Sequence, residues 1–306
     1  MAATYSDRKD RAMFLTPINT LGDAKVARVV DWQIEAFEPT GLLPDWDASH
    51  QPLLDAMPET MTPDGRHVLL SIHSWVVWLG GKIILIDTGV GNDKSRPFAP
   101  YFDRLSTPYL ARLEALGVTP EAVDYVLHTH LHVDHVGWNT RLIDGRWQPT
   151  FPNARHIFSA KEYAFFAVPA NAENRHRTSF QTQSDSVTPI VEAGLAEMID
   201  IDGSEIIPGF SFHSTPGHSV DHASIVLRSA GSTALFAGDV FHHPVQVFAP
   251  HLLSLFDPDR STALKSRFWA LDFAADTKAK LFSSHFPASG VGTVSRRGAE
   301  YVWSFT

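Results

Sequence analysis

The sequence predicts an α/β fold in which two groups of strands form two sheets with helices outside them. Short apolar runs of strand length alternate with segments of helical spacing along the chain. The strand-like runs fall into two groups, one in each half of the sequence. Hydrophobic residues make up 44% of the 306 residues, which suffices for one large core. Together these observations favour a layered α/β architecture.

Strand and turn patterns dominate the first half of the chain. Residues 1 to about 25 are polar and irregular, Lys25 to Phe37 partly alternates apolar and polar residues as a strand does, and residues 38–65 are expected to form a long loop or short helices. A tight turn at Gly80-Gly81 joins two further strands, and Thr119 is expected to cap a short helix before a buried strand. The two strands of this turn are predicted at residues 67–79 and 82–89, and the buried strand at 123–130. One more helix is predicted at residues 108–116.

The second half continues the alternation of strands and helices. A strand at residues 155–160 is followed by a helix at 161–168 and by the polar, irregular residues 169–190, which could form a flap. An amphipathic helix is predicted at residues 262–276, and residues 280–287 are predicted as the last strand. Three more strands are expected at residues 210–218, 223–229 and 233–239.

Composition excludes several classes of function. The net charge is −9, so a nucleic-acid-binding surface, which needs a basic stripe, is not expected. The chain has no cysteine, which excludes disulfides, thiolate metal ligands and a cysteine nucleophile. The N-terminal segment is polar, and the apolar runs VVWL and IILI are too short to span a bilayer. We therefore expect a soluble, cytoplasmic protein that binds neither nucleic acid nor membrane.

The densest chemical feature follows the buried strand at residues 123–130. Four imidazole or carboxylate side chains lie within six positions, at His130, His132, Asp134 and His135. On an extended segment His130 and His132 point to one face, and Asp134 and His135 follow where the chain should turn toward a second metal. Such groups are costly to bury unpaired, and zinc accepts them when thiolates are absent. Any one of them fits a solvated polar loop, but the four together favour a metal site.

Three further residues of ligand type lie at the ends of later strands. His218 ends the strand at residues 210–218, Asp239 ends the strand at 233–239, and His285 ends the run KLFSSH. The carboxyl ends of strands are where α/β proteins usually gather their active sites. Their shared placement indicates that they complete the site begun at His130.

The motifs HTHLHVDHVG, TPGHS, AGD and SSHF, in this order, resemble those of the metallo-β-lactamase superfamily over residues 65–290. The resemblance implies an αββα sandwich with two divalent metal ions at one edge. Zn²⁺ is the expected metal, although nitrogen and oxygen ligands also accept Mn²⁺, Co²⁺ or Fe²⁺. We expect residues 1–65 to form an N-terminal arm and the first strand, in the same domain as the catalytic part, residues 66–306.

The resemblance also implies a role for each ligand. One metal would be held by His130, His132 and His218, and the other by Asp134, His135 and His285. Asp239 would bridge the two metals, and Asp87 in IDTG would support a ligand histidine from outside.

The ligand pattern, which contains no cysteine, resembles that of the dinuclear branch of the superfamily. This branch contains acyl-homoserine lactonases, methyl parathion hydrolase-like enzymes and glyoxalase II. Residues 237–287 are most similar to the lactonase and methyl parathion hydrolase group. The resemblance implies a hydroxide, formed on two metals, that opens a lactone or cleaves a carboxylic ester. Hydrolysis of a phosphotriester is the alternative, and an iron-dependent redox reaction is a third. Asp134 is expected to orient the hydroxide and carry a proton, and His242 to contact the substrate oxygen where lactonases have a tyrosine.

The expected partner is a small molecule with an apolar acyl or aromatic group, and a homodimer is compatible with the N-terminal arm. His222 is expected either to hydrogen-bond a metal ligand or to be an ordinary strand-end residue, and His128 to be a core or supporting residue. The candidates for an apolar pocket wall are Trp138, Phe165, Phe166 and Phe241. For the neighbouring Phe165 and Phe166, packing in the core is the alternative.

Overall fold

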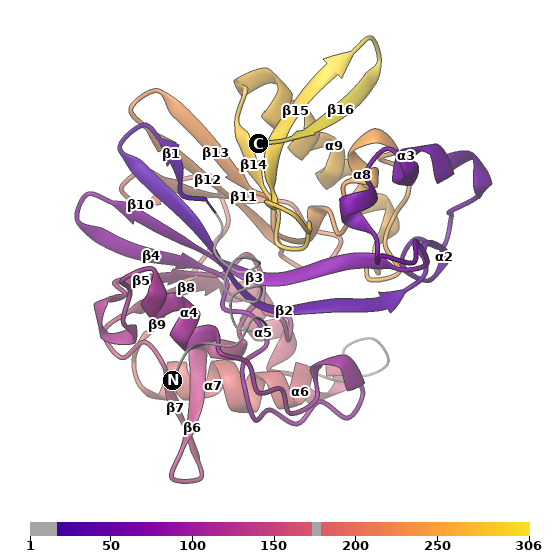
Figure 1. The fold of residues 1–306 in the computed structure, drawn as a ribbon. Helices are drawn as coiled ribbons and strands as arrows, with labels where there is room; N and C mark the ends of the chain where they lie inside the picture. The colour runs from indigo at the N-terminus through magenta and orange to yellow at the C-terminus, as the bar shows by residue number, and fades with distance from the viewer. Residues whose placement is uncertain (1–16, 173–178) are drawn as a thin grey trace, which may run out of the picture.

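The computed structural model describes residues 17–172 and 179–306, which form two facing β-sheets with helices on their outer sides (Figure 1). Within these residues each sheet has seven strands. A separate hairpin of β6 (Thr140–Ile143) and β7 (Arg146–Pro149) projects at the bottom of Figure 1. The predicted layered α/β class is confirmed as an αββα sandwich.

The first sheet is built by the N-terminal half of the chain in the order β1-β2-β3-β4-β5-β8-β9. Its first four strands are antiparallel, whereas β4, β5, β8 and β9 run parallel to one another. The carboxyl ends of these parallel strands therefore meet at one edge. The strands are β1 (Asn19–Leu21), β2 (Ala24–Phe37), β3 (Val68–Leu79), β4 (Lys82–Ile86), β5 (Tyr125–Leu127), β8 (Arg155–Ser159) and β9 (Ala196–Ile199).

The second sheet follows the chain in strict order from β10 to β16. Neighbouring strands are antiparallel except for β13 and β14, which are parallel. The strands are β10 (Glu205–Ile207), β11 (Phe210–Ser214), β12 (Ala223–Ser229), β13 (Ser232–Phe236), β14 (Lys280–Phe282), β15 (Val291–Arg297) and β16 (Glu300–Phe305).

Helices cover the outer face of each sheet. In Figure 1, α4 to α7 lie on the side of the first sheet, and α8 and α9 lie beside the second. The helices are α2 (Pro39–Leu42), α3 (Gln51–Asp55), α4 (Tyr109–Ala115), α5 (Ala160–Phe166), α6 (Ser179–Thr182), α7 (Thr188–Glu192), α8 (Val245–Phe248) and α9 (Arg260–Thr277). A π-helical turn, Gln183–Val187, joins α6 to α7, and single 3₁₀ turns lie at Ala48–His50, Pro58–Thr60, Pro100–Phe102, Pro120–Ala122, Gly137–Asn139, Pro169–Ala172 and Gly238–Val240.

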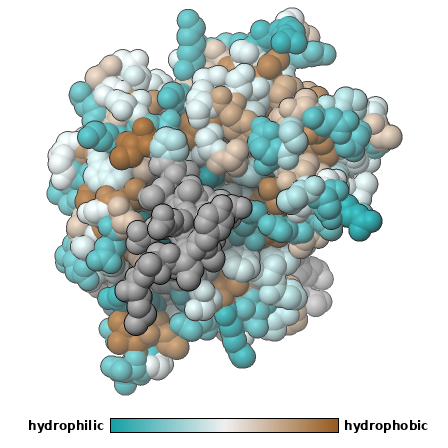
Figure 2. Space-filling view, viewed as in Figure 1, coloured by the Kyte–Doolittle hydropathy of each residue, from teal (hydrophilic) through white to brown (hydrophobic). Residues whose placement is uncertain are grey.

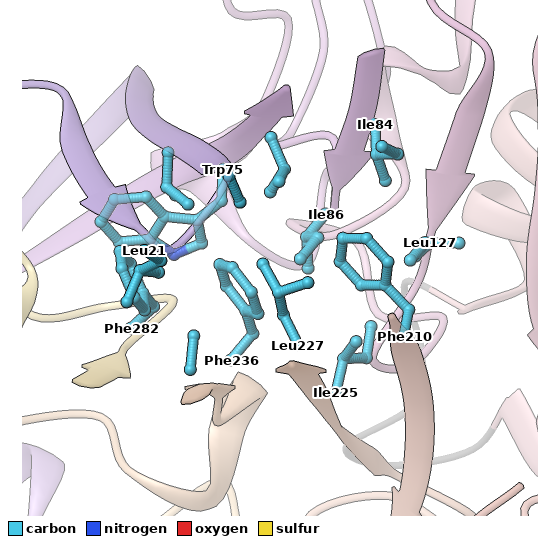
Figure 3. Packing of buried hydrophobic residues seen from close by; sticks show 14 of the residues in the cluster. Leu21, Trp75, Ile84, Ile86, Leu127, Phe210, Ile225, Leu227, Phe236 and Phe282 are labelled. Carbon is cyan, nitrogen blue, oxygen red and sulfur yellow. The ribbon is translucent and has the colours of Figure 1, made fainter. Parts of the chain in front are cut away.

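The main core lies between the sheets (Figure 3). Side chains alternate across a strand, so Ile84 and Ile86 of β4 face the second sheet, while Leu85 packs toward α4. Opposite them, Phe210 and Phe236 are fully buried on the second sheet. Burial on both faces explains the continuous apolar run IILI, and each such side chain contributes roughly 1.5–3 kcal/mol.

The N-terminal arm contributes structure beside the sandwich. β2 is hydrogen-bonded along its length to β3, and both strands continue toward α2 and α3 in Figure 1. There Ile34 of β2 and Ile72 of β3 pack with Leu42 of α2 and Leu54 of α3 in a second hydrophobic cluster. Of the two alternatives for residues 38–65, short helices are confirmed, and the assignment of residues 1–65 to the same domain as residues 66–306 stays a prediction.

Three predictions are wrong, one about which strand is the last, one about residues 179–190 and one about the end of the N-terminal segment. The strand at residues 280–287 is shorter, Lys280–Phe282, and is not the last, because β15 and β16 follow it. These two strands mix charged and apolar residues and therefore lack an apolar run. Residues 179–190 are helical rather than irregular, since their buried groups are mostly polar and show no apolar period. The rest of the proposed flap, 173–178, and residues 1–16 of the segment predicted to be irregular lie outside the described residues. The end of that segment, up to about residue 25, is not irregular, because it contains β1 and the start of β2.

Two local predictions need correction. The helix predicted at residues 262–276 is confirmed as α9, but its amphipathic pattern is weak, because its buried face includes Arg267 while Phe268 is exposed. The turn after Thr119 is a single 3₁₀ turn, and the Thr119 side chain makes no capping hydrogen bond. Arg267 is held by hydrogen bonds to backbone carbonyls and by Asp257, which apolar periodicity cannot anticipate.

The outer surface is mostly polar on the face seen in Figure 2. Hydrophilic and intermediate residues cover most of that face, and hydrophobic ones lie in small separate patches. Along the described part of the chain, every helix is too short or too polar to cross a membrane.

Candidate metal centre

The predicted metal ligands lie on loops that each follow the carboxyl end of a strand. The loop after β5 carries four of them, and the loops after β11, β13 and β14 carry one each. Since β13 and β14 are parallel neighbours, Asp239 and His285 leave the second sheet at the same edge. The structure brings all seven together: His130, His132, Asp134, His135, His218, Asp239 and His285.

The Asp239 carboxylate lies at the middle of this group. Its Oδ1 atom is 3.1 Å from His135 Nε2 and 2.9 Å from His285 Nε2. Its Oδ2 atom is 3.2 Å from His218 Nε2. The Asp239 carboxylate thus reaches imidazoles on both sides, which is the arrangement that a bridging carboxylate needs.

Two ligand triads flank Asp239. The ligand atoms of His130, His132 and His218 lie within 4.8 Å of one another, and those of Asp134, His135 and His285 do so as well. Within the first triad, His132 Nδ1 is 2.9 Å from His218 Nε2. Two ligand atoms bound to one tetrahedral zinc ion lie about 3.3 Å apart, so these spacings suit such an ion.

Asp87 and Thr129 fix the orientation of two ligand imidazoles. His135 Nδ1 donates to Asp87 Oδ2 over 2.8 Å, as predicted for Asp87. Thr129 Oγ1 donates to the same carboxylate and accepts from His130 Nδ1 at 3.0 Å. With Nδ1 engaged, each ring presents its Nε2 lone pair to the centre. His128, whose Nδ1 is 3.8 Å from Asp87 Oδ1, is a buried supporting residue as expected.

The second sheet orients the remaining imidazoles in the same way. His285 Nδ1 donates to the carbonyl of Ser71 over 3.1 Å. His218 Nδ1 lies 3.4 Å from Asp257 Oδ1, and the other oxygen of Asp257 contacts the buried Arg267 of α9. Burial alone would raise the pKa of Asp257, but the adjacent histidines and Arg267 lower it to about 2. Asp257 therefore stays ionised beside His218.

Unpaired buried atoms test whether this group fits a metal. Nε2 of His130 and of His135 and Oδ1 of Asp239 are buried and make no hydrogen bond among the described residues. Burial lowers the pKa of His130, and the charges of His285 and His135 outweigh burial to lower the pKa of Asp239. Burial would lower the pKa of His135, but Asp239 and Asp87 outweigh burial and raise it, so this ring carries a proton that a bound cation would displace. A neutral His130, an ionised Asp239 and a proton held where a cation would bind together fit divalent metal ions.

Gly238 and His222 determine where the Asp239 backbone lies. Gly238 has a φ of +55°, and a Cβ atom there would be 2.3 Å from His222 Nε2, so only glycine fits. The Asp239 amide donates to His222 Nε2 over 2.9 Å, and Thr215 holds the opposite ring nitrogen. The first of the two readings of His222 is therefore the correct one, because its hydrogen bond reaches a predicted ligand.

Glu162 connects the two loops that carry the first triad, and sequence analysis missed it. Its carboxylate accepts from the amide of Leu131 over 3.4 Å and from the amide of Asp221 over 2.7 Å. Ser159 caps α5 and also donates to Asp221 over 2.6 Å. The only sequence signal was a Ser and a Glu three residues apart at the start of a predicted helix.

His242 lies beside the triads, as its place after Asp239 predicted. Its Nε2 atom is 3.3 Å from Asp239 Oδ2, and its ring stacks on that of His285 at 5.5 Å. Burial lowers the pKa of His242, so the ring is neutral at neutral pH. A neutral imidazole at this position can donate one hydrogen bond.

An apolar cavity of about 290 Å³ opens above the centre. Its floor includes His132, Asp134, His218, Asp239, His242 and His285. Its walls come from β2, β3, the turn around Pro100–Phe102 and the segment before α9, through Ile34, Leu70, Ile72, Phe98, Ala99, Tyr101, Phe102, Leu255, Phe256 and Pro258. Among the described residues that line it, none is Lys or Arg.

The predicted pocket-wall residues lie elsewhere. Trp138 is buried and stacks on Tyr109 at 5.1 Å, because its amide bonds to Thr88 and turns the ring under the first sheet. Phe241 packs in the core beside α9. The wall assignment is wrong for both. Phe165 and Phe166 pack in a third cluster, which confirms the core alternative for this pair.

An αββα sandwich that gathers histidines and aspartates at one edge defines a class of metal-dependent proteins. Residues 68–285 match the family model of the metallo-β-lactamase superfamily, and the chain belongs to this superfamily of hydrolases. The resemblance drawn from the sequence is thereby confirmed.

Curated relatives match parts of the chain. N-acyl homoserine lactonase AttM of Azorhizobium caulinodans is 40% identical over 60 residues, which are 20% of this chain and 19% of AttM. Beta-lactamase-like protein 2 homolog of Caenorhabditis elegans is 24% identical over 176 residues, 57% of this chain and 46% of that protein. The chain thus matches less than half of the length of either relative.

Solved structures share the whole fold. The hydrolase AbOPH has a TM-score of 0.79 at 24% identity and covers 95% of this chain and 97% of its own. AidC, described as a dizinc quorum-quenching lactonase in complex with a product, has a TM-score of 0.79 at 22% identity over 96% of this chain and 98% of its own. These likenesses establish the fold.

Proposed function

We propose that the protein is a hydrolase that uses two divalent cations to open a lactone or to cleave a carboxylic ester. The observation that carries this proposal is the position of Asp239 between two ligand triads at the floor of an apolar cavity. His130, His132 and His218 would hold one cation, Asp134, His135 and His285 the other, and Asp239 both. The cations, most readily Zn²⁺, would supply Lewis acidity and a water acidic enough to attack at neutral pH.

Two residues of the floor are proposed to act on the reacting groups. Asp134 is 15% exposed at its side chain and faces the cavity, so it can orient the attacking water and carry its proton to the leaving group. His242 faces the same cavity as a neutral imidazole and is proposed to donate a hydrogen bond to the substrate oxygen. In the first role the Asp134 carboxylate carries a proton, and in the second a ring nitrogen of His242 holds one.

The cavity favours a neutral, apolar substrate. Its volume of about 290 Å³ is small for a ligand site, and its walls are aliphatic and aromatic. An anionic group placed against the wall, away from the metal centre, would lose hydration there without gaining a cationic side chain from the lining residues that the structure describes. An acyl chain or an aryl group, in contrast, gains from burial.

Phosphotriester hydrolysis is the second candidate. The aromatic side chains of Phe98, Tyr101, Phe102 and Phe256 in the wall favour an aryl leaving group. The likeness to AbOPH and AidC is compatible with either reaction.

A hydrolysis panel on protein of measured metal content tests the proposal. N-hexanoyl-L-homoserine lactone, p-nitrophenyl butyrate and methyl parathion represent the three bond types. We expect two equivalents of zinc per chain and turnover of the lactone or the ester. Turnover of methyl parathion alone would favour the second candidate. Two equivalents of metal with no turnover of any of the three would refute the proposal, and iron with oxygen uptake would indicate redox chemistry instead.

A matched pair of histidine variants separates the centre from general damage. His132→Ala is expected to lose metal and turnover. His213→Ala removes a half-buried histidine that stacks on Trp269 of α9 and lies outside the ligand group. It is expected to keep both.

A further inference from the structure

A closed loop before α4 carries much of the cavity wall. The Asp93 amide bonds to the Leu105 carbonyl over 3.0 Å, and the Arg104 amide bonds to the Lys94 carbonyl over 2.8 Å, which closes the loop at its base. Its tip supplies four lining residues: Phe98, Ala99, Tyr101 and Phe102. We call residues 93–105 the wall loop. Whatever holds its base determines where the tip lies.

Two cations of the wall loop point away from the cavity into a buried pocket of polar groups. Arg96 donates two hydrogen bonds to the Asp185 carboxylate, at 2.6 and 2.8 Å. Lys94 Nζ donates to Thr140 Oγ1 over 2.8 Å and to the Asp185 carbonyl over 3.2 Å, and it lies 3.8 Å from the centre of the Trp147 ring. Both cationic side chains have no exposed surface.

Asp185 belongs to the π-helical turn Gln183–Val187 between α6 and α7. Ser179 of α6 lines the cavity, so the segment that begins with α6 contributes to the site as well. The link from Lys94 and Arg96 to Asp185 thus joins the wall loop to a second segment of the lining. A π-helical turn is rare and is often found at functional sites.

The link between the two segments depends on the carboxylate of Asp185, because this one group faces both basic side chains. A buried cation without a partner is strongly disfavoured. A bidentate Arg–carboxylate pair also fixes direction, unlike a point charge. A contact with these properties holds two segments in one relative position.

We propose that Lys94, Arg96 and Asp185 position the wall loop over the metal centre and thereby set the preference for large over small ester substrates. They are positioning residues, because they touch the loop and not the floor of the cavity. The selectivity part of the proposal rests on the proposed esterase function, whereas the positioning part does not.

Two variants separate positioning from stability. Asp185→Asn leaves two buried cations unpaired, so it removes both the directional link and stability. Lys94→Met combined with Asp185→Asn removes one basic group and one carboxylate, which below about pH 7, where Lys94 is protonated, restores the original net charge without restoring the bidentate pair. We expect the double variant to regain stability in urea but not the positioning. Arg96→Lys, which keeps the charge and loses the fork, serves as the alternative if Asp185→Asn does not fold.

The measurements are amide hydrogen exchange, metal content, and kinetics on p-nitrophenyl acetate and p-nitrophenyl octanoate. In the double variant we expect amides of residues 98–102 to exchange about tenfold faster than in the wild type. The kcat/KM ratio of octanoate to acetate should fall about tenfold through KM, with kcat on acetate and the metal content unchanged. Leu113→Ala, on the buried face of α4, serves as the control, which should lower stability without changing the ratio.

Several results would overturn the proposal. If exchange in the wall loop and the selectivity ratio return to wild-type values together with stability in the double variant, the cluster is only structural. An equal loss of kcat on both esters with loss of metal would place the effect at the centre. If the wild type hydrolyses neither ester, the proposed esterase function and the selectivity part that rests on it fail, and unchanged exchange in Asp185→Asn or Arg96→Lys would then refute the positioning separately.

Discussion

The metal centre and the cavity wall above it are built in different ways. In the centre, buried imidazoles and carboxylates come from strand ends, and most have a second atom held by a named partner, as His135 is by Asp87. In the wall, apolar side chains come mainly from loops and hold one another by packing, as Tyr101 does with Phe102 at 4.7 Å. The rigid sheets thus place the groups for chemistry, and the loops shape what reaches them.

This difference predicts two kinds of functional damage. A change in the centre removes a group that acts on every substrate, so it should lower turnover whatever the substrate is. A change in the wall alters only contacts with the part of the substrate that does not react, so its effect should depend on substrate size. The predictions below test this division, beginning with the centre.

Asp239→Ala is expected to have the largest effect. It removes the carboxylate that reaches both triads and leaves His135, His218 and His285 facing an empty position. We expect at least one metal to be lost and turnover of any working substrate to fall more than about a thousandfold. Metal analysis and initial rates measure this. Asp272→Ala on the surface of α9 is the matched control and should keep both. Full activity in Asp239→Ala would remove the basis for the proposed centre.

Lys94→Met tests the electrostatics behind the wall. Burial, partly offset by Asp185, lowers the pKa of Lys94 to about 7. Because this is below the unfolded value of 10.5, the unfolded chain binds more protons between these two values. The wild type should therefore gain stability as pH rises above about 7, by at most about 1.4 kcal/mol per pH unit. The variant should lack this gain.

Urea unfolding at about pH 7, 8 and 9 checks this difference. The quantity to compare is the slope of the unfolding free energy against pH in the two proteins, since the charged groups around Lys94, namely Asp185, Arg96 and Asp93, are common to both. Parallel slopes would mean that Lys94 remains charged in the fold throughout this range.

The two regions also differ in how well the sequence predicted them. The ligands were predictable because His130 to His135 is dense in groups that packing cannot explain, and because the other ligands end apolar runs. Asp239 and His285 were predictable from their position just after an apolar strand, where active-site residues usually lie. Asp87 also follows an apolar run, KIILI, but its supporting role was predicted from the resemblance alone.

The wall could not be predicted from the sequence, because its residues share no motif and no period. Phe98, Tyr101 and Phe256 are brought together only by the path of loops, and an aromatic residue in a loop has the same local pattern whether it lines a cavity or fills a core. Trp138 was predicted to line the pocket because it follows the motif at His130 to His135 closely. Its ring instead stacks on Tyr109, away from the cavity. The Arg96–Asp185 pair joins residues far apart in sequence and leaves no local trace.

Asp87→Asn probes the outer layer of the centre. Asp87 has a φ of +55°, which asparagine tolerates, so the backbone should be kept. The carboxylate accepts from His135 Nδ1 and Thr129 Oγ1 at Oδ2 and from the Thr129 amide at Oδ1, so an asparagine side chain, whose second atom is an NH₂ donor, cannot satisfy both positions, and it removes the charge that fixes the His135 ring. We expect metal affinity to fall about 10- to 100-fold, measured by competition with a chromophoric chelator. Asp124→Asn, at a carboxylate that pairs with the exposed Lys82, should leave affinity unchanged, and equal affinities in all three proteins would contradict the supporting role.

Phe98→Ala is expected to have the smallest effect and gives the sharpest test of the division. Phe98 lines the cavity yet is 57% exposed, so its removal should change stability little. The loss of a partly buried ring contact should raise KM for p-nitrophenyl octanoate about three- to tenfold and leave kcat on p-nitrophenyl acetate unchanged. Phe268→Ala, at a ring of similar exposure on α9 away from the cavity, is the matched control. If Phe98→Ala lowered kcat equally on both esters, the wall would take part in the chemistry, and centre and wall would have to be treated as one site.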